Sequence, residues 1–184
     1  MKLHFEADLD YQLQAIEAVC DLFKGQKACQ TEFMVTMPRD PASLFAGSES
    51  DLGIGNRLMP LRDEVQANLA KVQLDRGLKP TELPAGNELN DANFTVEMET
   101  GTGKTYVYLR TIFELNRRYG FTKFVIVVPS VAIKEGVYKS LEIMEEHLRG
   151  LYANVPFSKG NNYFLYDSGK LGQVRNLPRV RRFR

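Results

Sequence analysis

The sequence predicts an α/β fold in which helices flank a mainly parallel sheet. One observation is an alternation of apolar and polar residues, in which Phe94, Val96 and Met98 recur at period two, as in a strand. Another is the continuous apolar run 124–128, which ends at Pro129 and is typical of a parallel strand covered on both faces. A helical pattern follows each segment, and such alternation of strands and helices predicts a parallel sheet.

Helices are predicted where apolar residues repeat at helical spacing, as Leu13, Ile16 and Cys20 do in the opening segment. Three of these patterns stop at a glycine, which is a common C-terminal cap because it adopts positive φ without strain. The stop residues are Gly25, Gly77 and Gly120. The predicted helices run from Asp8 to Lys24, from Arg62 to Arg76, from Lys104 to about Arg118 and from Val131 to about Leu148. The residues of the third helix expected to face inward are Tyr106, Leu109, Ile112 and Phe113.

Composition divides the chain into three parts. Residues 1–32 hold the opening helix, and residues 33–93 form a loop-rich insertion with one helix, because proline and glycine are dense from Pro38 onward. Residues 94–184 should form the core of the fold, with a weaker strand candidate at Tyr163–Tyr166.

Composition also excludes several classes of protein. The longest apolar run is of strand length, far below the about 20 residues that a membrane helix needs. Acidic residues interrupt the N-terminus where a secretory signal would be apolar, so we expect the chain to be cytoplasmic. Cys20 and Cys29 lack the spacing of metal ligands and support neither a zinc site nor a disulfide framework.

Charge is distributed unevenly along the chain. The first 100 residues carry 9 basic and 17 acidic residues, whereas the remaining 84 carry 15 basic and 6 acidic residues. A basic half is compatible with binding to nucleic acid, and equally with solvated charged faces. The asymmetry therefore supports an interaction with DNA without establishing it.

A phosphate-binding motif lies between the first predicted strand and the third predicted helix. It reads Thr100-Gly101-Thr102-Gly103-Lys104-Thr105. Glycines let the backbone wrap around phosphate oxygens, and the new helix points its free N–H groups at the anion. Lys104 should act as the catalytic lysine on the β- and γ-phosphates of ATP, and the Thr105 hydroxyl should bind Mg²⁺. The alternative is a glycine-rich turn with a solvated lysine, which the flanking strand and helix patterns disfavour.

One departure from the general phosphate-binding motif narrows the class of protein. Six positions before Lys104, where the general pattern has glycine, the chain has Met98. This form resembles motif I of superfamily 2 helicases and translocases. The resemblance implies a RecA-like P-loop NTPase lobe, and it makes a small-molecule kinase a poorer interpretation.

Two further stretches resemble the same superfamily. Residues 11–16 resemble the Q motif, in which a glutamine at the start of a helix reads the adenine edge, and Gln12 is the candidate. A solvent-facing glutamine is the alternative. Residues 128–136 resemble motif Ia, which implies that Ser130 and Lys134 contact DNA phosphates. The alternatives are a helix N-cap for Ser130 and a surface charge for Lys134, and the two roles of Ser130 are compatible.

Longer stretches resemble the restriction (Res) subunit of type III restriction-modification enzymes, namely residues 94–110, 127–137 and 166–170. The resemblance runs from the opening helix to about Asn176. It implies an ATP-dependent DNA translocase and endonuclease that uses ATP and Mg²⁺ and works with DNA and a modification (methyltransferase) subunit. Another superfamily 2 helicase, and a nucleotide-binding or DNA-binding remnant without turnover, are the competing hypotheses.

The Walker B acid pair and the nuclease motif of that family are not found in the sequence. The adjacent acid pairs are Asp63-Glu64 and Glu145-Glu146, and neither ends an apolar strand. We therefore expect an incomplete RecA-like lobe from the N-terminal part of a longer protein, whether a truncated gene product or an expressed fragment. Such a chain should bind ATP with little turnover.

Overall fold

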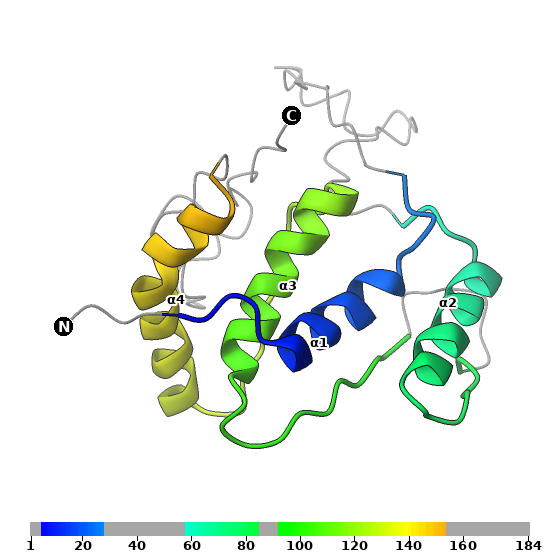
Figure 1. Ribbon diagram of the computed structural model, residues 1–184, viewed down its shortest axis with the longest axis horizontal. Helices are drawn as coiled ribbons and strands as arrows, with labels where there is room; N and C mark the ends of the chain where they lie inside the picture. Colours follow the sequence, from blue (N-terminus) through cyan, green and yellow to red (C-terminus); the bar gives the residue numbers. More distant parts are fainter. Residues whose placement is uncertain (1–4, 28–57, 85–91, 154–184) are drawn as a thin grey trace, which may run out of the picture.

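A computed structural model describes residues 5–27, 58–84 and 92–153 of the chain (Figure 1). The helices of this part are α1 (Asp10–Asp21), α2 (Arg62–Asp75), α3 (Lys104–Tyr119) and α4 (Val131–Leu151). The four predicted helices are thus confirmed, with ends that differ from the expected ones by three residues or fewer. The strand candidate Tyr163–Tyr166 lies outside the described residues.

The predicted parallel sheet is wrong for the part of the chain that the structure describes, which contains no β-strand. Val125 and Val127 are 84% and 86% exposed, whereas a strand of a covered parallel sheet would bury them. A strand forms only where neighbouring backbone supplies a ladder of hydrogen bonds. No such ladder joins the two apolar segments among the described residues, so the RecA-like arrangement of sheet and helices is not observed.

The helix ends follow local capping chemistry. Gly25, Gly77 and Gly120, the predicted stop residues, all have positive φ. At the end of α3, Gly120 has a φ of 73° and its amide donates to the Asn116 carbonyl at 2.8 Å. A residue with a side chain would be strained in this left-handed conformation, so the glycine ends the helix.

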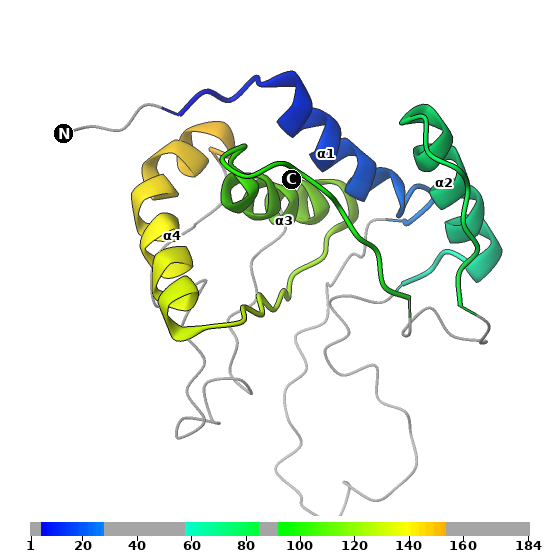
Figure 2. The same ribbon diagram turned by 90° about the horizontal axis from the view of Figure 1, so that it is seen from below.

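Two apolar clusters hold α3 between α1 and α4, as both views show (Figures 1 and 2). The buried residues of the α1 cluster are Ile16, Cys20, Val107, Leu115 and Phe121. Those of the α4 cluster are Tyr106, Leu109, Phe113, Leu141, Met144, Leu148 and Tyr152. Each fully buried leucine side chain stabilises the fold by about 1.5–3 kcal/mol. Of the inward positions predicted on α3, Ile112 alone is only partly buried.

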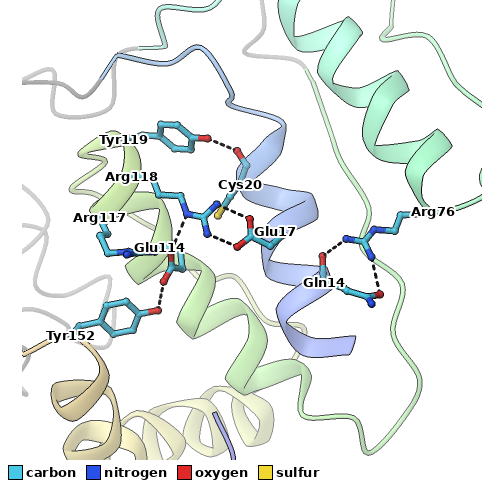
Figure 3. A network of polar contacts seen from close by, with 9 residues as sticks. All are labelled: Gln14, Glu17, Cys20, Arg76, Glu114, Arg117, Arg118, Tyr119 and Tyr152. Carbon is cyan, nitrogen blue, oxygen red and sulfur yellow. Dashed lines mark hydrogen bonds and ion pairs between the residues drawn. The ribbon is translucent and has the colours of Figure 1, made fainter. Parts of the chain in front are cut away.

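A charged network joins the C-terminal ends of three elements (Figure 3). Glu114 of α3 accepts hydrogen bonds from Arg117 at 2.6 Å, from Arg118 at 3.0 Å and from the Tyr152 hydroxyl after α4 at 2.8 Å. Burial raises the pKa of Glu114, but the hydrogen bonds from Arg117, Tyr152 and Arg118 together lower that pKa below its usual value. Glu114 is therefore a charged group that stabilises the fold at neutral pH.

Helix α2 belongs to the predicted insertion and packs beside α1 on the side away from α3 (Figures 1 and 2). Arg76 donates to the side chain of Gln14 at 2.8 Å and to its carbonyl at 3.0 Å. The Asn68 amide donates to the carbonyls of Leu22 and Lys24 just beyond α1. These polar contacts join α2 to α1 and to the residues just beyond it.

The structure also bears on the composition-based exclusions. Among the described residues, no helix combines the length and the apolar character that crossing a membrane requires. The same residues hold no group of three or more histidine, cysteine, aspartate or glutamate side chains that could bind a metal ion. Cys20 is a buried free thiol, and burial raises its pKa to about 12, while Cys29 lies outside the described residues.

Candidate nucleotide-binding site

The glycine-rich motif forms a turn that leads directly into α3. Gly101 and Gly103 have φ values of 83° and 81°, a left-handed conformation that glycine adopts without strain. The Thr102 hydroxyl donates to the Glu99 carbonyl at 2.7 Å and closes the turn. The loop from Thr100 to Lys104 is thus wrapped rather than straight, with its shape set by its own residues.

The Lys104 side chain folds back across this loop. Its ammonium group donates to the carbonyls of Met98 at 2.6 Å and Glu99 at 2.7 Å, while the residue remains exposed. Thr105 is half-buried in the first turn of α3. The first helical bond of α3 runs from the Val107 amide to the Gly103 carbonyl, so the preceding amides have no acceptor within the helix. A lysine, a hydroxyl and free amides therefore share one end of α3.

Gln12 of α1 docks on the same loop although it lies 90 residues away in sequence from Thr102. Its side-chain Nε2 donates to the Thr102 carbonyl at 2.9 Å, and the residue is only 5% exposed. A Cβ atom placed on Gly103 would lie 2.7 Å from this nitrogen, so glycine permits the close approach. The interpretation of Gln12 as a solvent-facing glutamine is therefore wrong.

The other half of the Gln12 amide lacks a partner. Its Oε1 atom is buried and accepts no hydrogen bond from the described residues. A buried acceptor without a donor costs about 1–3 kcal/mol, which is unusual in a protein interior. Because Nε2 is held by the loop, Oε1 is the atom of the Gln12 amide that is left without a partner among the described residues.

The structure does not bring Ser130 and Lys134 to this loop. Ser130 is the N-cap of α4, where its hydroxyl accepts from the Ile133 amide at 3.3 Å, so the capping role is confirmed. Lys134 is half-buried in the first turn of α4. Figure 2 shows the start of α4 apart from the loop before α3. Any contact of either residue with DNA would therefore lie on a different surface from that of the glycine-rich loop.

Sequence reasoning did not single out Tyr11, which stands beside the site. The residue is 47% exposed, and its hydroxyl lies 3.5 Å from Gln12 Nε2. An exposed aromatic ring next to a buried amide acceptor suits a flat, polar-edged ligand. The available signal was its position directly before Gln12 in the sequence.

One acid of each adjacent pair has a structural role in the described part of the chain. Glu64 caps α2, because its carboxylate accepts from the Leu61 amide at 2.7 Å. Glu145 of α4 pairs with Arg149 at 2.6 Å. These bonds hold both acids at helix surfaces and not at the glycine-rich loop.

Comparison with known proteins gives one consistent family. The sequence profile described as "Type III restriction enzyme, res subunit" matches residues 7–163. The Res subunit of the EcoPI enzyme from Escherichia phage P1 is 31% identical over 150 residues, which cover 80% of this chain and 14% of that protein. The StyLTI Res subunit of Salmonella typhimurium is 51% identical over 65 residues, covering 34% of this chain and 7% of that protein. The EcoP15I Res subunit of Escherichia coli is also 51% identical, over 59 residues. The chain thus spans a small fraction of the length of these relatives.

Proposed function

The chain belongs to the family of type III restriction enzyme Res subunits, and from this premise we propose that it binds ATP with Mg²⁺ at the loop of residues 100–105. Lys104 binds the β- and γ-phosphates, while the backbone amides of Thr100, Gly101, Thr102 and Gly103 surround their oxygens. Lys104 is already folded over the loop by its bonds to two carbonyls, so a bound phosphate needs only to attract the ammonium group away from them. Thr105 supplies a hydroxyl oxygen, a donor suited to Mg²⁺, whose further ligands would be phosphate oxygens and water.

The observation that carries the proposal is the docking of Gln12 on this loop with a buried, unpartnered Oε1. The exocyclic amino group of adenine is a hydrogen-bond donor, whereas guanine has a carbonyl oxygen at the same position. An acceptor held in place by the loop therefore favours adenine. A mismatched pair would leave two acceptors facing each other without a proton between them.

A paired measurement tests this function on the whole 184-residue chain. A fluorescent ATP analogue is titrated in the presence and in the absence of Mg²⁺, and ATP and GTP are then compared as competitors for its site. Phosphate release from ATP is followed with and without duplex DNA. We expect saturable, Mg²⁺-dependent binding that ATP displaces better than GTP. Phosphate release should be slow, because one acid of each adjacent pair, Glu64 and Glu145, is engaged at a helix surface. Absence of saturable binding would refute the proposal that the loop binds ATP. DNA-stimulated turnover near one per second would refute the expectation of slow phosphate release, because competent enzymes typically turn over at about 1 to 10³ per second.

A matched pair of glycine variants separates loop strain from base recognition. Gly101→Ala and Gly103→Ala each place a side chain at positive φ, which costs about 1–2 kcal/mol of stability. Only the Gly103→Ala methyl group meets Gln12, since nothing lies within 4 Å of the Gly101 position. We expect a loss of thermal stability from both that is at least as large for Gly103→Ala, and a reduced preference for ATP over GTP from Gly103→Ala alone. Equal preferences in the two variants would contradict the role of Gln12.

We further propose that the chain contributes to an ATP-driven DNA translocase and endonuclease that acts with a modification (methyltransferase) subunit. The relatives are Res subunits of type III restriction-modification enzymes. Ser130 and Lys134 are the proposed contacts to DNA phosphates, at the exposed start of α4. The 15 basic against 6 acidic residues after position 100 support an anionic partner for this half.

A further inference from the structure

We propose that the ion pair between Glu17 and Arg118 positions Gln12 on the phosphate-binding loop and so sets the preference of the site for adenine nucleotides. This inference rests on the proposed function, because it concerns how that same site selects its ligand. Glu17 does not contact the loop, and it would act through the placement of α1. It is therefore a positioning residue.

Polar contacts near its two ends join helix α1 to the loop before α3 and to the end of α3. Near its start, Gln12 donates to the Thr102 carbonyl at 2.9 Å. Near its end, the Cys20 carbonyl accepts from the Tyr119 hydroxyl at 2.8 Å (Figure 3). The Glu17 and Arg118 side chains meet between these two ends of α1 and on the same side as α3 (Figure 3).

The apolar part of this interface does not fix the position of α1 by itself. Ile16 and Cys20 pack against Val107 and Leu115, and such burial is favourable over a range of shifts and rotations because the hydrophobic effect is not directional. A hydrogen bond between Gln12 and an adenine edge tolerates only a narrow range of distance and angle. Directional contacts are therefore required to fix α1 with the accuracy that base recognition needs.

The ion pair has the geometry for this task. Arg118 forms a bidentate ion pair with Glu17, with nitrogen to oxygen distances of 2.5 and 2.7 Å. A planar guanidinium bound to both carboxylate oxygens constrains direction as well as distance. The hydrogen bond from Arg118 also holds the pKa of Glu17 below its usual value, so the carboxylate is charged at neutral pH.

Arg118 is itself held in place on α3. Its Nε donates to Glu114 at 3.0 Å, and the Glu114 side chain is 8% exposed and also accepts from the Tyr152 hydroxyl. Glu17 is thus bound to an arginine that α3 and the end of α4 already orient. Since α3 begins at the phosphate-binding loop, this arrangement ties α1 to the same helix that carries Lys104 and Thr105.

The test uses Glu17→Ala, the conservative variant Glu17→Gln and the matched control Glu145→Ala. The control also removes a glutamate from an arginine pair, but the Glu145–Arg149 pair lies within α4. Dissociation constants for ATP, GTP and inorganic tripolyphosphate are measured by competition against a fluorescent ATP analogue. Thermal melting confirms that each variant is folded.

We expect Glu17→Ala to reduce the ATP over GTP preference about fivefold, which corresponds to the loss of one neutral hydrogen bond. Glu17→Gln, which keeps one acceptor oxygen, should recover part of the preference, and Glu145→Ala should retain it. Tripolyphosphate affinity should stay within about twofold of that of the wild-type chain, because bonds within the loop itself set the shape of the loop. Loss of the Glu17–Arg118 ion pair should have little further effect, since ion pairs at a protein surface contribute little to stability.

Different outcomes contradict the inference and the proposed function separately. If the wild-type chain prefers ATP over GTP and Glu17→Ala keeps that preference, the inference about the ion pair is wrong, but the proposed ATP-binding function is not contradicted. Equal losses for ATP, GTP and tripolyphosphate in Glu17→Ala would also overturn it, because they would show a purely structural role. If the unchanged chain binds neither ATP nor tripolyphosphate, the proposed function fails and the inference fails with it.

Discussion

Replacing Lys104 by alanine is expected to lower the affinity of the chain for ATP by about 10- to 100-fold, because a hydrogen bond between charged groups contributes roughly 1.5–3 kcal/mol. The ammonium group lies across the loop on the carbonyls of Met98 and Glu99, where a phosphate bound at the start of α3 comes within its reach. The measurement is a titration of the fluorescent ATP analogue at constant Mg²⁺ concentration and ionic strength.

The matched control for this prediction is Lys71→Ala. Lys71 is an exposed lysine on α2, and α2 packs against α1 and not against the loop. The control removes the same charge from the chain, so it accounts for any general electrostatic attraction of the nucleotide. If Lys104→Ala loses no more ATP affinity than Lys71→Ala does, the loop is not the nucleotide site.

The helices could be predicted because their causes are local. Apolar spacing marks the buried face of α3, Gly120 ends it, and Ser130 caps the start of α4, all within a few residues of the element concerned. The strands could not be predicted in the same way. The run that contains Val125 and Val127 has the composition of a buried strand, but pairing depends on backbone supplied from elsewhere, and both side chains are exposed.

In the candidate site, too, features with local causes could be predicted, whereas contacts between distant residues could not. The positive φ of Gly101 and Gly103 follows from the motif itself, since glycine is the residue that adopts it freely. That Gln12 belongs to the nucleotide site was indicated only by a family resemblance, and its contact with the Thr102 carbonyl was not predicted. Nothing in the local sequence pairs Glu17 with Arg118, which lie 101 residues apart, since a glutamate and an arginine on two helix surfaces have many alternative partners.

Replacing Glu114 by alanine is expected to destabilise the fold by about 2–3 kcal/mol, the largest single loss of stability in the network of Figure 3. The variant removes the acceptor for Arg117, Arg118 and the buried Tyr152 hydroxyl. Arg117 is 59% exposed and can return to water, and Arg118 keeps Glu17, so the loss stays below that of breaking an isolated buried pair. The Tyr152 hydroxyl, by contrast, is left buried without its acceptor.

Denaturant unfolding at neutral and at acidic pH measures this effect, with Glu145→Ala as the control. That variant breaks an exposed pair within α4 and should cost less than about 0.5 kcal/mol. Because the pKa of Glu114 is lowered in the folded chain, its contribution is present above the unfolded carboxyl pKa and is lost as the pH falls through the folded-state value. The stability gap between the unchanged chain and Glu114→Ala should therefore narrow on acidification. A gap that is absent at neutral pH, or that widens in acid, would show that Glu114 is not a charged acceptor joining α3 to the end of α4.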